Sequence, residues 1–462
     1  MFLDIDKKPQ DRVAAIDDSK QSVTYGELCA FSEEFEQNVI SRSLIVIFAQ
    51  NSIGSLMGYV ASLSAKIVPL ILSANTDREL YEQLIEKYAP QYIWSPESMC
   101  GNIEGERLFS KCNYVLMKVA SCSPPLYKEL SLLLPTSGST GSPKLVRHSY
   151  RNIEANARNV ATLFGLTKNE IPVVALPMHY TMGLSVITSH LLVGAKLFIS
   201  SKSLMDRSFW SDLKEYKVSS FTGVPFSYEI MDKIHFFKMD FPDLKIITQG
   251  GGKLSSELFK KCSEYAIQTN KKFIPTYGQT EGTARMAFLK PERAIDKIGS
   301  IGQAIPNGTL SVIDSEGVET TEGEAIGEMI YRGENVTLGY AVCKEDLQKG
   351  DDNNGILHTG DIVRRDSEGF YFIVGRMKRF LKIFGLRIGL DEVEYLVKSN
   401  FNTDCVCSGS DDFLEIRITN REIENAVQAF IMEKTKLFHK NIRVITVESI
   451  ERNETGKVIL NK

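Results

Sequence analysis

The feature that most constrains the fold is an alternation of short β-type runs with helix-type periodicity over the first third of the chain. The run SLIVIFAQ (43–50) is followed by the helix-type run GSLMGYVASLSAKIVPLIL and then by DRELYEQLIEKYAPQYIWS, which ends in another short strand. The stretches TLFGLTKNEIPVVALPM and DLKIITQGGGKLSSELFKKC repeat the pattern. Strands that alternate with helices favour parallel α/β layers. Small residues at the strand ends predict crevices, where open α/β sheets usually bind ligands.

The chain of 462 residues is longer than a single core usually grows, so more than one domain is expected. After Gly299 the helix signal fades into short strands with turns, which predicts a smaller β-rich subdomain. The last segment alternates both patterns again. We therefore predict an α/β protein in which residues 1–377 form a large N-terminal domain of layered sheets with the β-rich subdomain. Residues 378–462 are expected to form a small mobile α+β domain.

Composition disfavours several classes of protein. The formal net charge is -4, and no dense Lys/Arg block suggests a nucleic-acid partner. The start, MFLDIDKKPQ, lacks an export signal, and the most apolar segment, 56–72, is interrupted by polar residues and Pro69, so no membrane span is expected. Eight cysteines occur without a CxxC pair, which is typical of free thiols in a reducing cytoplasm.

The nine residues TSGSTGSPK (136–144) follow the apolar run Leu132–Pro135. They do not match the Walker phosphate loop, because that pattern needs Ser or Thr directly after its lysine. Two glycines still let backbone N–H groups approach an anion, while five hydroxyls and Lys144 supply donors for phosphate oxygens. Taken alone, the stretch could also be an exposed Ser/Gly loop.

A second motif, PTYGQTEGTARM (275–286), combines an aromatic ring, a glycine turn, a hydroxyl and a carboxylate. An ATP site needs a surface for adenine, which Tyr277 could provide. It also needs an oxygen ligand for Mg²⁺, which Glu281 could provide with help from Thr280. The two motifs together therefore favour a nucleotide site.

These two motifs, with HTGD (358–361), GRMKRFLKIFGLRI (375–388) and NETGK (453–457), occur in the order and spacing of the adenylate-forming superfamily, which the chain resembles over nearly its whole length. That superfamily includes acyl-CoA synthetases, firefly-type luciferases and the adenylation domains of peptide synthetases. The resemblance implies a site for ATP and Mg²⁺ and a role for each matching residue. It implies that the β and γ phosphates are held by Thr136, Ser137, Gly138, Ser139, Thr140, Gly141 and Lys144.

The same resemblance implies that Tyr277 lies against adenine beside Gly278 and that Glu281 binds Mg²⁺. It further implies that Asp361 accepts hydrogen bonds from the ribose diol, with Arg376 beside it. Without the resemblance, HTGD would be read as a β-turn with a capping aspartate.

Two lysines carry the implied mechanism. Lys457 matches the C-terminal lysine that enters the site when a carboxylate attacks the α-phosphate, and a positioned cation is needed there because two anions approach each other. Lys378 matches the hinge at which the C-terminal domain turns between adenylation and thioester formation. From composition alone, Lys457 would be solvated charge in a tail, and 376–382 a basic surface strand.

The acid pocket is expected between LPMHYTMGLSVITSHLLVGA (176–195), FTGVPFSYEIM (221–231) and TQGGGKL (248–254). Many acyl-CoA ligases have a histidine where this chain has Tyr180, which His179 precedes. This difference leaves open which residue closes the entrance of the acid pocket. No Asp or Glu occurs from Ile171 to Met205, so an α-ammonium group would lack a partner and an amino acid is disfavoured. The remaining expected site residues are Gly183 and Gly252 in the pocket, and Gly250 and Gly251 at the nucleotide.

The sequence thus predicts an acid–thiol ligase that forms an acyl-adenylate from a small carboxylic acid and MgATP. The acyl group then passes to CoA or to the phosphopantetheine thiol of an acyl carrier protein. Alternatives are an acyl-AMP ligase dedicated to a carrier protein, an amino-acid adenylation enzyme, or an inactive nucleotide-binding scaffold. The identity of the acid, the acceptor thiol and the oligomeric state stay open.

Overall fold

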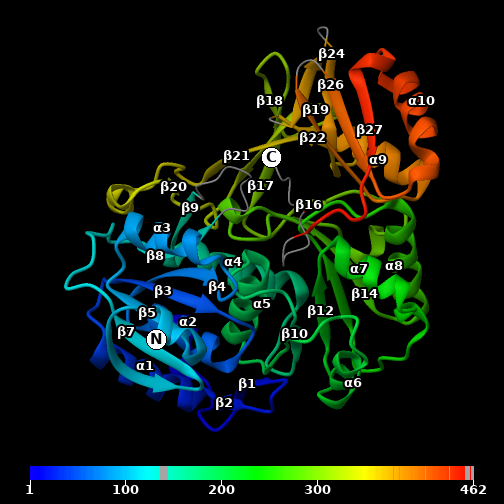
Figure 1. Ribbon diagram of the computed structural model, residues 1–462. Helices are drawn as coiled ribbons and strands as arrows, with labels where there is room; N and C mark the ends of the chain where they lie inside the picture. Colours follow the sequence, from blue (N-terminus) through cyan, green and yellow to red (C-terminus); the bar gives the residue numbers. More distant parts are fainter. Residues whose placement is uncertain are drawn as a thin grey trace.

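Two large sheets form the body of the protein (Figure 1). The computed structural model describes residues 1–135, 144–377, 379–383, 386–410, 413–435, 437–452 and 458. The nine-stranded sheet has the order β16-β15-β14-β13-β12-β10-β11-β1-β2, and the eight-stranded sheet has the order β20-β9-β8-β4-β3-β5-β7-β6. The strands of the first are β1 (Val13–Asp17), β2 (Ser22–Thr24), β10 (Pro172–Val174), β11 (Leu197–Ile199), β12 (Ser220–Gly223), β13 (Ile246–Gln249), β14 (Lys272–Tyr277), β15 (Ala287–Phe288) and β16 (Gln303–Ala304). Those of the second are β3 (Leu44–Ala49), β4 (Val68–Ser73), β5 (Tyr92–Pro96), β6 (Glu106–Lys111), β7 (Tyr114–Lys118), β8 (Leu130–Pro135), β9 (Leu145–Ser149) and β20 (Tyr340–Ala341).

Helices cover these sheets in layers. One apolar cluster joins α1, α2, α4 and α5 to the inner faces of both sheets, so these helices lie between the sheets. A second cluster packs α3 on the outer face of the eight-stranded sheet, and a third packs α6, α7 and α8 on the outer face of the nine-stranded sheet. The helices are α1 (Tyr25–Asn38), α2 (Ile53–Ser64), α3 (Arg78–Tyr88), α4 (Tyr150–Phe164), α5 (Thr181–Leu192), α6 (Arg207–Glu215), α7 (Pro225–Lys233) and α8 (Ser256–Gln268).

The apolar strand runs follow from burial on both faces. In β3, Ile45 and Ile47 face the central helices, while Val46 and Phe48 face α3, because successive side chains of a strand point to opposite faces. The central helix α2 is buried along nearly its whole length, which explains why its sequence is apolar all round. The prediction of layered α/β sheets is confirmed.

The β-rich region after residue 299 is a five-stranded antiparallel sheet of order β18-β17-β19-β21-β22. Its strands are β17 (Thr309–Ile313), β18 (Glu319–Thr320), β19 (Ala325–Arg332), β21 (Ile356–Arg365) and β22 (Tyr371–Arg376). The predicted subdomain of short strands and turns is therefore confirmed.

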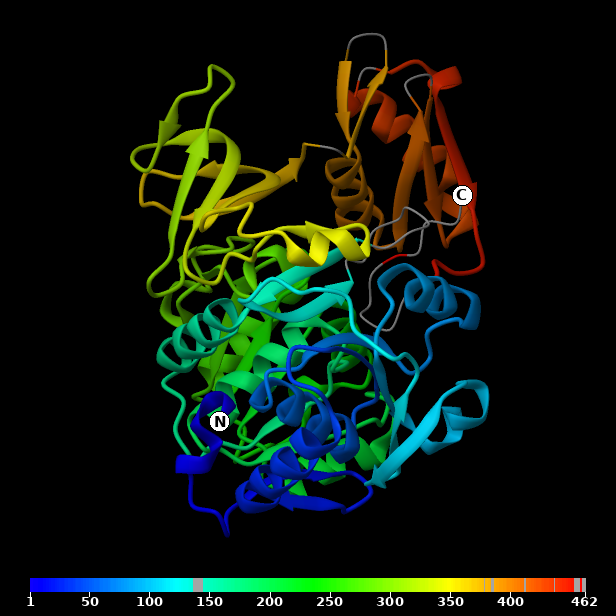
Figure 2. The same ribbon diagram turned by 90° about the vertical axis from the view of Figure 1, so that its left-hand side faces the viewer.

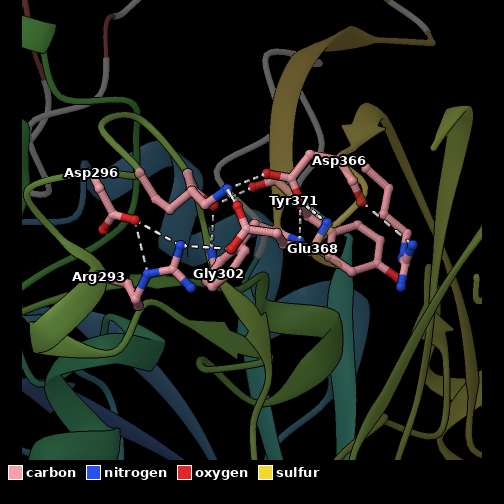
Figure 3. A network of polar contacts seen from close by, with 10 residues as sticks. Arg293, Asp296, Gly302, Asp366, Glu368 and Tyr371 are labelled. Atoms are coloured by element: carbon pink, nitrogen blue, oxygen red, sulfur yellow. Dashed lines mark hydrogen bonds and ion pairs between the residues drawn. The ribbon is translucent and has the colours of Figure 1, made fainter. Parts of the chain in front are cut away.

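A network of ion pairs joins this five-stranded sheet to the preceding segment (Figure 3). Lys297 pairs with Asp366 at 2.8 Å and also with Glu368, while Arg293 pairs with Glu368 at 2.9 Å. An isolated antiparallel bridge between Gly302 and Tyr371 lies beside these pairs. The turn between β21 and β22 is therefore fixed to the segment that connects β15 and β16 of the nine-stranded sheet.

The C-terminal elements form a smaller body with its own apolar core (Figure 2). The antiparallel pair β23–β24 packs beside a three-stranded sheet of order β25-β26-β27, and two helices complete the fold. This agrees with the predicted α+β character, while the boundary at residues 377 and 378 stays a prediction because Lys378 lies outside the described residues. The elements are β23 (Phe380–Ile383), β24 (Leu386–Gly389), α9 (Leu390–Phe401), β25 (Cys405–Ser410), β26 (Phe413–Ile418), α10 (Glu424–Thr435) and β27 (Ile442–Thr446).

The C-terminal body contacts the N-terminal body near α7 and α8. The hydroxyls of Tyr395 and Ser256 lie 3.1 Å apart, and the Lys253 ammonium lies 3.9 Å from the centre of the Tyr395 ring. The Arg452 guanidinium lies 5.7 Å from the ring centre of Phe226, on α7. Among the described helices, none combines the length and the apolar character that a bilayer crossing requires.

Candidate active site

The predicted site residues gather at the carboxyl edge of the parallel strands. Strands β10, β12, β13 and β14 are parallel neighbours, so Gly223, Gln249 and Tyr277 end their strands at one edge of the nine-stranded sheet. In the other large sheet, β8 is parallel to β4 and ends at Pro135, directly before the phosphate-loop motif. In both sheets, parallel strands thus end beside predicted motifs, as expected for ligand sites at strand ends.

Asp361 is the centre of a polar cluster at this edge. It lies on β21 opposite Arg376 of β22 and is only 2% exposed. The Tyr277 hydroxyl donates to its Oδ2 at 2.5 Å, and Gln279 Nε2 donates to the same oxygen at 2.9 Å. Arg376 Nε donates to Oδ1 at 3.1 Å. The structure therefore brings three predicted residues, Tyr277, Asp361 and Arg376, into direct contact.

The donors around Asp361 differ in how firmly they are held. Burial raises the pKa of Tyr277 well above its ordinary value, and the neighbouring Asp361 carboxylate raises it further, so the phenol stays protonated and donates. Arg376, by contrast, has a side chain that is 61% exposed. Of the three donors, the exposed Arg376 is therefore the one that can be replaced, which suits a carboxylate that accepts hydrogen bonds from a diol.

Glu281 and Thr280 lie on the short 3₁₀ turn Thr280–Gly282 that follows β14. The Tyr340 hydroxyl donates to Glu281 Oε1 at 2.6 Å, and the Lys144 ammonium lies 5.4 Å from the centre of the same tyrosine ring. The Thr181 hydroxyl donates to the Thr280 hydroxyl at 3.0 Å. Lys144 and Glu281, which are 137 positions apart in the sequence, therefore share Tyr340 as a neighbour.

The glycines after β13 form a wall against the predicted acid-pocket segment. A methyl group on Gly251, which has a φ of +78°, would lie 2.7 Å from the Tyr180 hydroxyl, and one on Gly250 would lie 3.1 Å from the Met182 side chain. A methyl group on Gly252 would lie 3.1 Å from Pro225 at the start of α7. Small residues are needed here because the pocket segment approaches the backbone closely. We call Gly250–Gly252 the glycine wall.

Two other predicted glycines have packing roles in the structure. A methyl group on Gly183 would lie 2.3 Å from the Pro177 carbonyl oxygen, and one on Gly278 would lie 1.3 Å from the Ala284 carbonyl oxygen. Both positions require glycine because two backbone segments touch there. Their predicted binding roles stay predictions.

The neighbouring residues His179 and Tyr180 lie in different surroundings. Tyr180 contacts the glycine wall, whereas His179 lines a cavity of about 830 Å³. That cavity lies outside the ends of β1, β3, β4, β5, β10 and β11, and its lining includes Asp17, Asn51 and Ser200. Of the predicted site residues that the structure describes, His179 is the one in this cavity, so the cavity is separate from the Asp361 cluster.

Several predicted site residues lie outside the described part of the chain, namely Thr136, Ser137, Gly138, Ser139, Thr140, Gly141, Lys378 and Lys457. The residue that follows Lys457 is described: Val458 forms an isolated antiparallel bridge with Arg452, which contacts α7. Arg452 is also held by Asp404, at 2.7 Å between Nη2 and Oδ2.

Sequence reasoning missed three residues of this region. Gln279 and Arg285 both occur inside the motif PTYGQTEGTARM, so their place beside Tyr277 and Glu281 was a usable signal. Tyr340 had no comparable signal, because its partner Glu281 lies 59 positions earlier in the sequence. Arg285 is fully buried and contacts Ser185 on α5.

Two stacked α/β sheets that end at a common polar edge define a ligand-binding α/β protein of the layered type. The chain belongs to the AMP-binding enzyme family, because the model of that family, described as AMP-binding enzyme, matches residues 3–341. The resemblance stated from the motifs is therefore confirmed.

Among characterised proteins, the chain is similar to the oxalate–CoA ligase of Arabidopsis thaliana, at 27% identity over 343 residues, which cover 71% of this chain and 66% of that enzyme. It is also similar to the 2-succinylbenzoate–CoA ligase of Oceanobacillus iheyensis, at 24% identity over 475 residues, which cover 98% of this chain and 96% of that enzyme. The chain spans less than two thirds of the length of that oxalate–CoA ligase and of two other CoA ligases that it matches, at 66%, 65% and 55%.

Among solved structures, the chain resembles the o-succinylbenzoate CoA synthetase MenE of Bacillus subtilis in complex with the acyl-adenylate intermediate OSB-AMP. The TM-score is 0.81 at 20% sequence identity, and the match covers 99% of this chain and 96% of that chain. The same enzyme has been solved in complex with ATP and magnesium ion. At this identity the likeness establishes the fold, with a large N-terminal and a smaller C-terminal domain.

Proposed function

We propose that the protein is an acid–thiol ligase that works through an acyl-adenylate. In the first half-reaction an oxygen of the acid attacks the α-phosphorus of ATP, and the bond to pyrophosphate breaks. In the second, a thiol sulfur attacks the acyl carbon, the bond to the phosphate oxygen breaks, and AMP leaves. The observation that carries the proposal is the contact of Tyr277, Gln279 and Arg376 with Asp361 at the strand-end edge of a chain from this family.

In this proposal the Asp361 cluster binds the nucleoside. Asp361 accepts hydrogen bonds from the hydroxyls of the ribose, and Arg376 either moves away from Asp361 or binds the ribose beside it. Tyr277 and Gly278 lie against adenine. Lys144 and the loop residues 136–141 hold the β and γ phosphates. This assignment of nucleoside and phosphate binding to two groups of residues is supported by the exposed Arg376 side chain and by the position of Lys144 near Tyr340.

The residues near Glu281 fit a magnesium ion. Glu281 is half-buried, and its carboxylate has a phenol as its hydrogen-bond donor rather than a cation. Mg²⁺ usually takes one or two carboxylates and completes its shell with water and substrate phosphates, so one glutamate at this place is enough. When bound, the ion would neutralise charge on the phosphates. Glu281 would hold it, and Thr280 would orient the turn that carries Glu281.

We further propose that Lys457 neutralises charge as the acid displaces pyrophosphate and that Lys378 is the hinge between a domain of residues 1–377 and a domain of residues 378–462. The described neighbour of Lys457, Val458, supports this proposal: it bridges to Arg452, Arg452 contacts α7, and Pro225 of α7 borders Gly252. No protein nucleophile is needed, because the phosphoanhydride is itself activated.

The substrate proposed is a small carboxylic acid, bound between the glycine wall and residues 176–183, which include Tyr180, Gly183 and His179. The acceptor is the thiol of CoA or of a carrier protein, in a cytoplasmic setting that all eight free cysteines suit. Relatives named for oxalate and 2-succinylbenzoate make these acids the first to try.

An acid panel read by pyrophosphate exchange tests the first half-reaction, and AMP release with CoA or with a phosphopantetheine-bearing carrier protein tests the second. We expect exchange with at least one acid and thiol-dependent AMP release. Glu281→Gln should lower exchange about a hundredfold, as is typical when one charge-stabilising group is lost, while the exposed control Glu292→Gln should leave it unchanged.

Other outcomes identify the alternatives. Exchange without any CoA-dependent AMP release would favour a ligase dedicated to a carrier protein. Exchange with amino acids alone would favour an amino-acid adenylation enzyme. A lack of exchange with every acid, alongside measurable ATP binding, would overturn the proposal in favour of a scaffold.

A further inference from the structure

Arg285 is a fully buried cation in neutral surroundings. Its side chain is among the largest that are completely enclosed, at 2% exposure. Nη1 donates to the Ser185 hydroxyl at 2.7 Å, Nη2 donates to the Thr222 hydroxyl at 3.4 Å, and the guanidinium lies 5.3 Å from the centre of the Phe164 ring. Within the described part of the chain, Nε has no hydrogen-bond partner.

Among the residues whose burial is described, the other fully buried arginine is Arg147, and its contacts show what a structural role requires. Arg147 donates to the backbone carbonyls of Leu338, Tyr340, Lys349 and Gly350 and pairs with the Asp352 carboxylate at 2.5 Å. Arg285 has two hydroxyl partners for five N–H groups, and no described carboxylate forms an ion pair with it. A buried charge without a counter-charge is costly, so its retention points to an anion that is supplied from outside the chain.

The guanidinium keeps its charge in the free protein. Burial lowers the pKa of Arg285 to about 10, and the nearby Tyr180 acts in the opposite direction. The group therefore remains protonated at neutral pH. Burial of Tyr180 raises its pKa to about 12, so the phenol is neutral at neutral pH and supplies no counter-charge to Arg285.

The hydrogen-bond partners of Arg285 lie on elements that border the proposed acid pocket. Ser185 is on α5, two positions after Gly183, and Thr222 is the third residue of β12. The Thr248 hydroxyl donates to the Thr222 hydroxyl at 3.0 Å, and β13 leads from Thr248 into the glycine wall two residues later. The elements that carry the partners of Arg285 are thus the ones that carry the walls of the pocket.

We propose that Arg285 binds an anionic group of the acid itself, so that the preferred substrates are dicarboxylic acids whose second carboxylate pairs with the guanidinium. This inference rests on the proposed function. Nε and an Nη group of one guanidinium can bind a carboxylate in a bidentate way, and such a pair is stronger than a hydrogen bond between neutral groups. The positive charge would also reject an α-ammonium group.

The test compares matched acids that differ by one carboxylate: butyrate with succinate, hexanoate with adipate, and benzoate with terephthalate. The readout is kcat/KM for pyrophosphate exchange in the full-length enzyme. For at least one pair we expect the diacid to exceed the monoacid by about 10- to 100-fold, the range for hydrogen bonds to a charged group. A preference for the monoacid in every pair would overturn the inference without any variant.

Arg285→Met removes the charge and keeps most of the volume, and it should bring the diacid-to-monoacid ratio to about one or below while the KM for ATP stays unchanged. Arg285→Lys should restore part of the ratio. Arg158→Met, at an exposed arginine of α4, is the control and should leave the ratio as in the wild type. A ratio that stays high in Arg285→Met would overturn the inference.

The inference and the proposed function fail differently. Exchange with monoacids alone would overturn the role of Arg285 and leave the acid–thiol ligase standing. A lack of exchange with all six acids and with those of the wider panel would overturn both.

Discussion

The Asp361 carboxylate accepts three hydrogen bonds while it is almost completely buried, and its donors come from two distant parts of the chain. Tyr277 ends β14 and Gln279 follows it, whereas Arg376 ends β22. A single side chain therefore connects the nine-stranded sheet with the five-stranded sheet. For these hydrogen bonds the negative charge of Asp361 is more important than the shape of its side chain, because all three partners are donors.

Asp361→Asn should weaken ATP binding with little effect on the fold, because asparagine has the same shape but lacks the charge and one acceptor. We expect the KM for ATP in pyrophosphate exchange to rise about 10- to 100-fold, with a smaller change in the KM for the acid. Asp314→Asn is the control, since that carboxylate accepts backbone N–H groups in a turn of the same sheet. An unchanged KM for ATP in Asp361→Asn would contradict the proposed role.

At this scale the sequence predicted Tyr277, Glu281, Asp361 and Arg376 as site residues from motifs, and the structure brings three of the four into contact. Their roles toward ATP stay predictions. The pairing of Tyr340 with Glu281 could not be read from a motif, since contacts between distant segments leave no periodic pattern. That no described carboxylate forms an ion pair with Arg285 depends on which side chains surround it. Those neighbours are set by the fold and leave no local pattern in the sequence.

Among the elements, strand and helix types follow from periodicity, but the order of strands in a sheet does not. The alternation at residues 43–95 predicted the strands β3 and β5 in a parallel layer, and the structure confirms them, while β4 lies in the run that was assigned helix-type periodicity. In contrast, β1 pairs in parallel with β11, and β20 adds to β9 of the eight-stranded sheet from beyond residue 300. These pairings join segments more than 180 positions apart, so local patterns hold no information on them.

The turn between β21 and β22 should be acid-sensitive through Asp366 (Figure 3). Burial alone would raise the pKa of Asp366, but Lys297 and the backbone N–H groups of Phe370 and Glu368 lower it below its ordinary value of 3.8. A depressed carboxyl pKa stabilises the folded state above the unfolded pKa, and this contribution is lost as pH falls below about 4.

Lys297→Met should therefore lower the midpoint temperature of thermal unfolding at pH 7. Between pH 5 and pH 3 the midpoint temperature of the variant should fall less than that of the wild type, because ionised Asp366 stabilises the variant less. The control is Lys260→Met, at an exposed lysine that pairs with Glu264 on α8. Equal acid sensitivity in Lys297→Met and in the wild type would contradict the assigned role of the pair.

At the scale of the whole molecule, the two bodies meet through few described contacts, at Tyr395 and Arg452. The proposed division of labour between two poses of the C-terminal body can be tested with Lys457→Ala. Adenylation should fall about a hundred- to thousandfold, because a positioned cation is lost where two anions approach each other. Thioester formation from supplied acyl-adenylate should be spared.

The two half-reactions are measured separately, by pyrophosphate exchange and by thioester yield from the supplied adenylate. Lys440→Ala, at an exposed lysine of the same body, should change neither. Equal loss of both half-reactions in Lys457→Ala would contradict the two-pose mechanism.

The parallel pairing of β1 with β11 has a consequence for synthesis on the ribosome. Residues 13–17 leave the exit tunnel early, but their partner at residues 197–199 emerges only after more than 170 further residues have been added. The nascent chain must therefore carry β1 with one edge paired to β2 and the other edge open until the middle of the protein is made, and this is the period in which chaperone binding would protect that open edge best from aggregation.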